Sequence, residues 1–296
     1  MQTTELIKAI RNKDLYRLKR LIAEGADVNE TDGQGWQALF EASSKGYMDV
    51  VKLLSENGED INTHDRTGRS ALLFAAAEGH IEMVKFLLDH GAVIDITSEN
   101  TSKDCRPDSI LFYTIGYPDI TRLFLQHGAD MNAKDTQGYT VLASALDAEC
   151  LDTAYVLLEH ISEMSDINAR TEEGHTALMY ADKNGYTDIV RTLKNAGAKD
   201  DNIEPALINT AGMTGRMDMI EYFIGKGANV NAQDDYGHSA LIEATIIEDS
   251  KIIRYLIEHG ADVNIKDNQG ATALSVAQHY GYREVINLLK KAGAKE

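Results

Sequence analysis

Hydrophobic positions recur along the chain in short blocks at helical spacing, separated by polar turns. In the stretch 65–95, Asp65–Gly68 has the composition of a turn. Small apolar residues directly after it predict one helix, and a more strongly apolar block from Ile81 to Leu88 predicts a second. Gly79 separates the two blocks, and Gly91 closes the second as a helix C-terminal glycine. The pattern therefore predicts a unit of turn, small helix, large helix and loop.

The loop after the larger helix recurs at a nearly fixed period. Leading glycines of successive copies stand 33 residues apart in four intervals (58 − 25, 91 − 58, 260 − 227 and 293 − 260). A helix pair of this length cannot bury its apolar faces alone, so such units stack into a solenoid. We expect nine helix pairs, counting two atypical ends. The Asn at the fifth place of the loop suits local side-chain-to-backbone bonds. Copies of the loop, GADVN in its commonest form, begin at Gly25, Gly58, Gly91, Gly128, Gly227 and Gly260.

A six-residue motif opens the smaller helix of the six regular repeats and keeps a Leu at its third place and an Ala at its sixth. It is similar to the T-P-L-H-x-A signature of the ankyrin-repeat family, with Pro replaced by Ala or Val and the His lost. The resemblance covers essentially the whole chain. It implies an all-α ankyrin-repeat solenoid of stacked helix pairs with hairpin-like turns, and a scaffold that binds partners. The copies are Gln37–Ala42, Ser70–Ala75, Thr140–Ala145, Thr176–Ala181, Ser239–Ala244 and Thr272–Ala277.

Three stretches interrupt the period. Four extra residues fall within Ser98–Asp108, which predicts either a tolerated surface insertion or a longer projecting loop. Three extra residues fall at Ile161–Ser165, where the closing glycine is missing, and the hairpin is shortened at Lys199–Pro205. We expect the solenoid to deviate from regularity at these three places.

The sequence LKNAGAK at Leu193–Lys199 resembles LKKAGAK at the end of the chain, Leu289–Lys295. Polar last helices are typical of terminal capping repeats. We therefore predict an array of six repeats over 1–199, ending in a cap-like repeat, followed by an array of three over 200–296. A fusion or internal duplication explains this division, and so does drift in a single hairpin.

Charge narrows the possible partners. With 47 acidic and 29 basic residues, the formal net charge is −18. Such a field repels phosphate backbones and anionic membranes, so we expect no nucleic-acid binding and no membrane insertion. No apolar signal core stands at the N-terminus, and the two cysteines form no disulfide or metal pattern. We expect a cytoplasmic monomer, with export by a route that needs no cleavable signal peptide as the alternative.

The histidines do not predict chemistry. His90, His127, His160 and His259 share one repeat position, the end of the larger helix, where a cation suits the helix dipole. No nucleophile, base or metal-ligand set converges elsewhere, so we predict a non-catalytic protein without metal or cofactor. Two alternatives stay open: an enzyme or effector with a cryptic site in the loop around Cys105, and a small-molecule-binding regulator.

In the ankyrin family, ligands usually meet the hairpin turns and the inner face of the smaller helices. We predict that this concave groove binds another protein, whose identity the sequence does not give. The candidates include aromatic and Arg side chains, the types enriched at interface hot spots. The alternative for each residue is surface decoration or packing between repeats. We expect those from Tyr236 onward to form one apolar stretch. The candidates are Trp36, Arg66, Arg69, Tyr139, His175, Tyr236, His238, Ile246, Ile247 and Tyr280.

Overall fold

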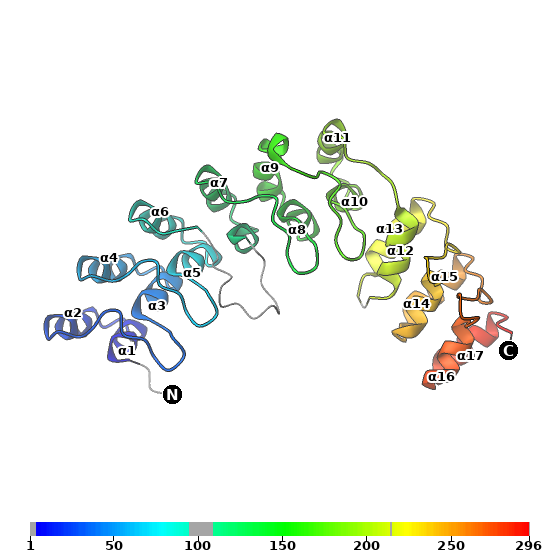
Figure 1. Cartoon of the computed structure of the whole chain (residues 1–296), viewed down its shortest axis with the longest axis horizontal. Helices are drawn as coiled ribbons and strands as arrows, with labels where there is room; N and C mark the ends of the chain where they lie inside the picture. The colour runs from blue at the N-terminus through cyan, green and yellow to red at the C-terminus, as the bar shows by residue number, and fades with distance from the viewer. Residues whose placement is uncertain (1–3, 95–108, 214, 296) are drawn as a thin grey trace. The chain divides into compact units, whose positions relative to one another are not determined.

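The computed structural model describes residues 4–94, 109–213 and 215–295. In these residues the regular structure is helical, and β-structure is limited to isolated bridges across three turns. The prediction of an all-α repeat solenoid is confirmed. The chain divides into two compact units, 1–167 and 168–296. Within each unit the smaller helices follow one another on one side and the larger helices on the other (Figure 1).

The first unit contains nine α-helices and two short 3₁₀ helices in its described residues. Pairs form between consecutive helices, except that the fourth pair begins with the 3₁₀ helix η2. The elements are α1 (Glu5–Arg11), α2 (Leu15–Ala23), α3 (Ala38–Ser44), α4 (Met48–Glu56), α5 (Ala71–Ala77), α6 (Ile81–Asp89), η2 (Ile110–Thr114), α7 (Pro118–Gln126), α8 (Val141–Asp147), α9 (Leu151–Glu159) and η3 (Ile161–Glu163).

The second unit contains eight α-helices in its described residues, arranged as four consecutive pairs. They are α10 (Ala177–Lys183), α11 (Thr187–Asn195), α12 (Ile203–Ala211), α13 (Met217–Gly225), α14 (Ala240–Ile246), α15 (Ser250–Glu258), α16 (Ala273–Tyr280) and α17 (Arg283–Lys291). With the pairs of the first unit, the nine helix pairs expected from the sequence are present.

Most of the smaller helices begin at a capping hydroxyl and bury small side chains, whereas α3 and α12 have no side-chain cap bond. Ser70 Oγ accepts the backbone N–H of Leu73 at 3.3 Å, which satisfies one of the free donors at the start of α5. Ala71, Ala75 and Ala76 are fully buried. Because these side chains are small, consecutive inner helices approach closely. The equivalent cap is made by Thr140, Thr176, Ser239 and Thr272.

The expected irregularities agree with the structure where they can be seen. Ser98–Asp108 lies outside the described residues. Ile161–Ser165 contains the short helix η3, which stands where the loop glycine is missing. Near Lys199–Pro205 no hairpin forms, and α12 follows Asn202, whose φ of 57° is left-handed. The two described deviations are therefore confirmed.

The fifth residue of the repeated loop bonds to the next loop rather than to its own. Asn29 Nδ2 donates to the carbonyl of Gly58 at 3.0 Å, and Asn29 Oδ1 accepts the N–H of Asp60 at 2.9 Å. Equivalent bonds span 29 to 33 residues of sequence. We expected this Asn side chain to bond within its own loop, and that expectation was wrong. Stacking of the repeats places backbone atoms of the following loop within reach of the Asn side chain. We term these residues the asparagine ladder: Asn29, Asn62, Asn132, Asn168, Asn231 and Asn264.

The division into arrays 1–199 and 200–296 remains a prediction, and two features of the second unit bear on it. Asp201 stands where a ladder Asn is expected, and its carboxylate accepts a bond from Arg170 at 2.6 Å instead. No ladder bond links this loop to the next in the part of the chain that the structure describes. Across the same junction, however, the Lys183 ammonium pairs with Asp218 at 2.6 Å.

Candidate functional site

A side-chain oxygen that accepts backbone N–H groups holds the hairpin turns, from Thr171 in the turn before α10 and from an aspartate in the others described here. Asp234 Oδ1 accepts the N–H of Tyr236 at 2.9 Å and the N–H of His238 at 2.8 Å. Asp65 and Asp135 bond in the same way in their own turns. The fourth residue after the Asp is thereby fixed beside the first turn of the smaller helix.

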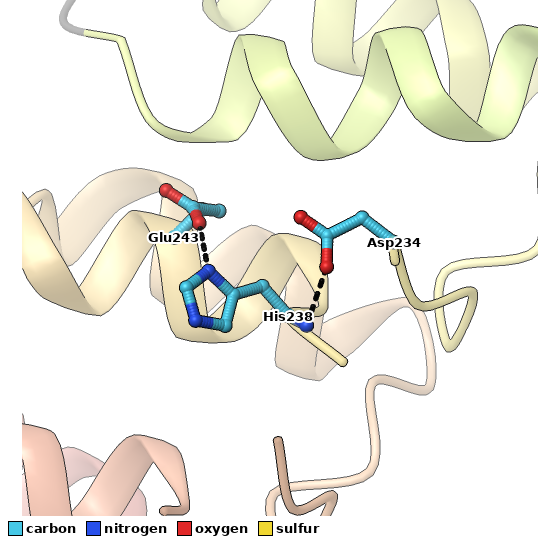
Figure 2. Close-up of side chains that lie close together, drawn as sticks. All are labelled: Asp234, His238 and Glu243. Carbon is cyan, nitrogen blue, oxygen red and sulfur yellow. Dashed lines mark hydrogen bonds and ion pairs between the residues drawn. The ribbon is translucent and has the colours of Figure 1, made fainter. Parts of the chain in front are cut away.

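In the repeat that contains α14, this arrangement brings a histidine together with carboxylates. His238 Nδ1 lies 2.6 Å from Glu243 Oε1, and His238 Nε2 lies 3.7 Å from Asp267 Oδ2 of the next turn. Figure 2 shows the Glu243 carboxylate against the Nδ1 edge of the ring and Asp234 beside the backbone nitrogen of His238. We term Asp234, His238 and Glu243 the His238 cluster. Their ligand atoms all lie within 4.8 Å of one another, and each residue is half-buried.

The two positions that pair as His238 and Glu243 also pair in other repeats, with different chemistry. They are the residue just before the helix motif and the motif's fifth residue. Hydrogen bonds, a cation over a ring, and ring contacts all occur there, so in these repeats the pair links the hairpin to its helix. The equivalents are Trp36–Glu41 at 3.1 Å, Arg69 with its guanidinium 4.8 Å from the Phe74 ring centre, and His175–Tyr180 at 2.9 Å.

A second group of side chains near the C-terminus is exposed and aromatic. Tyr236 is 73% exposed and Tyr280 is 57% exposed. The Tyr280 ring stacks on Tyr282 with centroids 5.5 Å apart and 16° between planes, and the Tyr282 hydroxyl donates to the carbonyl of Ile246 at 3.4 Å. Ile247 is half-buried at the end of α14. We term the following residues the C-terminal aromatic surface: Tyr236, His238, Ile246, Ile247, Tyr280 and Tyr282.

Comparison with known proteins agrees with this architecture. A family model described as ankyrin repeats matches in three copies, over residues 6–100, 111–205 and 207–296. The chain belongs to the ankyrin-repeat family.

Relatives share the repeats over limited stretches. A putative ankyrin repeat protein of Acanthamoeba polyphaga mimivirus is 26% identical over 79% of this chain and 27% of its own length. The mouse B-cell lymphoma 3 protein homolog is 32% identical over 43% of this chain and 30% of its own. The rat protein phosphatase 1 regulatory subunit 12A is 29% identical over 33% of this chain and 10% of its own. The ankyrin chain thus spans less than a third of each relative's length.

Ankyrin repeats generally mediate protein–protein interaction and are typically not enzymatic. None of the described helices is long and apolar enough to cross a membrane.

The ankyrin structure sorts the predicted partner-binding residues by accessibility. Tyr236, Tyr280 and Arg66 are exposed. Trp36, Arg69, His238, Ile246 and Ile247 are half-buried, and the first three of these bond within their own hairpin or helix. Tyr139 at 8% and His175 at 0% exposure are buried, so their expected place on the binding surface is corrected.

His175 is covered because the next repeat lies against it. Its Nδ1 lies 2.9 Å from the Tyr180 hydroxyl and its Nε2 lies 2.6 Å from Thr210 Oγ1, which itself donates to the carbonyl of Ala206 at 2.6 Å. Both bonds are satisfied when the neutral ring carries its proton on Nε2. Burial, with a further contribution from nearby Arg216, lowers the pKa of His175 to about 3. The side chain is therefore a neutral packing element between repeats.

Sequence reasoning missed two members of the site. Tyr282, which sequence reasoning did not consider, stands at the start of a larger helix, a position that Tyr47 and Tyr186 also hold. Glu243 was not connected with His238 because five residues separate them. The equivalent spacing of Trp36 and Glu41 is the signal that could have found the pair.

Two alternative functions were considered from the sequence: a cryptic site in the loop around Cys105, and a small-molecule-binding regulator. Cys105 lies outside the described residues. For a small-molecule regulator, a cavity of about 380 Å³ lies between the first two helix pairs, lined mainly by apolar side chains such as Ile10, Leu15, Leu18 and Val50. Its size lies near the lower end of ligand pockets.

Proposed function

We propose that the chain is a non-catalytic interaction module that binds another protein at the C-terminal aromatic surface. The observation that supports this most is the exposure of Tyr236 and Tyr280 on neighbouring repeats. An exposed tyrosine offers a large apolar area at a small entropic cost and is enriched at interface hot spots. The half-buried Ile246 and Ile247 lie next to the stacked pair of tyrosines and extend its apolar character.

The contribution of these side chains can be separated from folding. Neither Tyr236 nor Tyr280 has a side-chain hydrogen bond to another described residue, and both are largely in solvent. Replacing Tyr236 with Ser therefore changes the free energy of unfolding by about 0.5 kcal/mol or less. Replacing Tyr280 with Ser removes its stacking on Tyr282 and costs about 0.5–1.5 kcal/mol. At a hot spot the same change costs about 1–2 kcal/mol of binding free energy, or roughly 5- to 30-fold in affinity.

The experiment compares proteins captured from a lysate by the tagged chain and by two variants. Tyr236→Ser/Tyr280→Ser removes the two exposed rings of the surface. Tyr16→Ser removes an equally exposed ring, 80% accessible, on α2 of the first unit and is the matched control. We expect a protein that binds the wild type and the control and is depleted in the double variant by quantitative mass spectrometry. Equal capture by all three chains contradicts the proposed surface.

A further inference from the structure

We propose that the His238 cluster is a binding site for a divalent transition-metal ion, best matched by Zn²⁺. Zinc is bound in proteins by imidazole nitrogen and carboxylate oxygen at about 2.0–2.2 Å. The ligand atoms of Asp234, His238 and Glu243 lie within 4.8 Å of one another before any ion draws them together. To hold one ion at these lengths, His238 Nδ1 and Glu243 Oε1 would exchange their 2.6 Å hydrogen bond for bonds to the metal, and Asp234 would turn its carboxylate toward them. Three protein ligands leave a fourth position for water.

The turn already orients Asp234 for this role. Asp234 Oδ1 is engaged by backbone N–H groups, whereas Oδ2 has no hydrogen-bond or ion-pair partner among the described residues. In the equivalent turn, Asp65 Oδ2 accepts a bond from Arg69 Nε at 2.8 Å. In the turn of Asp234, His238 stands at the position of that arginine. The position therefore holds a possible metal ligand in place of a permanently charged side chain. The second carboxylate oxygen of Asp234 is therefore available to an ion.

The two nitrogens of His238 face groups suited to different tasks. Nδ1 faces Glu243 and is the nitrogen that would hold the metal. Nε2 faces Asp267 Oδ2 at 3.7 Å, and Asp267 uses its other oxygen to hold its own turn. Histidine ligands commonly donate their second N–H to a carboxylate, which fixes the tautomer and orients the ring. Asp267 would become a positioning residue for the site once the ring moves to close this 3.7 Å separation to hydrogen-bond distance.

Charge also favours a cation. Asp234, Glu243 and Asp267 face one histidine, and no Lys or Arg of the described chain forms an ion pair with any of the three. In the repeat of α3 the equivalent glutamate, Glu41, is paired with Arg11 at 2.9 Å. A divalent ion at the His238 cluster would supply the positive charge that an arginine supplies there. The imidazole favours a transition metal over Ca²⁺ or Mg²⁺, which prefer all-oxygen sites.

The test is isothermal titration of the full chain with ZnCl₂ at pH 7.5, alongside matched variants. We expect one saturable site in the wild type. His238→Gln and Glu243→Gln should each weaken it at least tenfold while the circular dichroism spectrum stays helical. Asp267→Asn should weaken it about tenfold or more without changing the stoichiometry, as for other outer carboxylates of zinc sites. His259→Gln, an exposed histidine at the end of α15, should leave it unchanged.

Two results would overturn the proposal. One is the absence of a saturable site in the wild type. The other is a Zn²⁺ affinity that stays the same in both His238→Gln and Glu243→Gln, which would place the ion elsewhere. Titration with CaCl₂ checks the choice of metal, because an affinity for Ca²⁺ equal to that for Zn²⁺ contradicts a nitrogen-containing site. If His238→Gln fails to fold, Glu243→Gln decides, since the turn itself is held by the bonds of Asp234 Oδ1 to backbone N–H groups and not by Glu243.

Discussion

Glu59 occupies the second place of the repeated loop, where Ala26, Ala129 and Ala261 stand in other repeats. The side chain is 7% exposed, and both carboxylate oxygens are buried without a hydrogen-bond partner in the described structure. Burial, reinforced by the charges of Asp27 and Asp60, raises the pKa of Glu59 to about 8. Near neutral pH the carboxyl is therefore largely protonated, and its ionisation opposes folding.

The direction of this effect with pH follows from the two pKa values of Glu59. The value in the fold, about 8, lies above the ordinary 4.5 that applies to the unfolded chain. The contribution that the protonated Glu59 carboxyl makes to the stability of the fold is fully present below pH 4.5, and it is lost as pH rises through 8. Glu59→Ala should therefore raise the free energy of unfolding at pH 8.5 by on the order of 3–5 kcal/mol more than the same substitution does at pH 4.5.

Urea unfolding at the two pH values measures this difference. Glu56→Ala, which removes an exposed carboxylate from the neighbouring α4, is the matched control and should show little dependence on pH. A Glu59→Ala effect that is the same at pH 4.5 and 8.5 would show that the carboxyl reaches solvent in the folded state.

At the scale of elements, the repeats are joined both by apolar helix packing and by the asparagine ladder. Asn231 donates to the carbonyl of Gly260 at 3.1 Å and accepts the N–H of Asp262 at 2.7 Å. A pair of bonds between successive loops performs the task that a β-ladder performs between strands. A loop that receives such a pair of bonds is consequently held by the loop that precedes it.

Asn231→Ala should break one such joint. With both bonds lost at a largely exposed site, we expect a cost of about 1–2 kcal/mol in the stability of the second unit. The specific readout is amide hydrogen exchange by NMR, where the N–H of Asp262 should lose protection. The N–H of Asp60, which bonds to Asn29 in the first unit, is the control within the same molecule. Unchanged protection at Asp262 would mean that the bond contributes nothing in solution.

At the scale of the whole molecule, the sequence predicted what depends on repetition and missed what depends on the neighbouring repeat. Helix pairs, period and irregular joints follow from residue spacing, because every unit solves the same packing problem. The burial of His175 could not be predicted, since Thr210 of the following repeat covers it. The reach of the ladder asparagines and the pairing of His238 with Asp267 were missed for the same reason. These contacts are set by how far one repeat stands from the next.

The predicted division into arrays of six and three belongs to this scale. Asp201 interrupts the ladder at the junction, while buried bonds such as His175–Thr210 cross it. We expect the loop connection to be the weaker part, so that hydrogen exchange is faster through Lys199–Pro205, which includes the first residues of α12, than in α11 and the rest of α12. Exchange followed by mass spectrometry over residues 160–240 measures this. Even protection across the whole range would identify the junction as an ordinary joint between repeats.

The ladder bonds of the asparagines go to backbone atoms of the loop that follows, a carbonyl that every residue carries and an N–H that every residue except proline carries. The joint is therefore indifferent to the identity of the side chains it receives. Substitutions on a hairpin or an inner helix can accumulate without disturbing it, and whole units of one period can be lost, copied or exchanged between arrays. A chain built this way can acquire a new binding specificity by rearranging interchangeable parts, while the means of assembly stays constant.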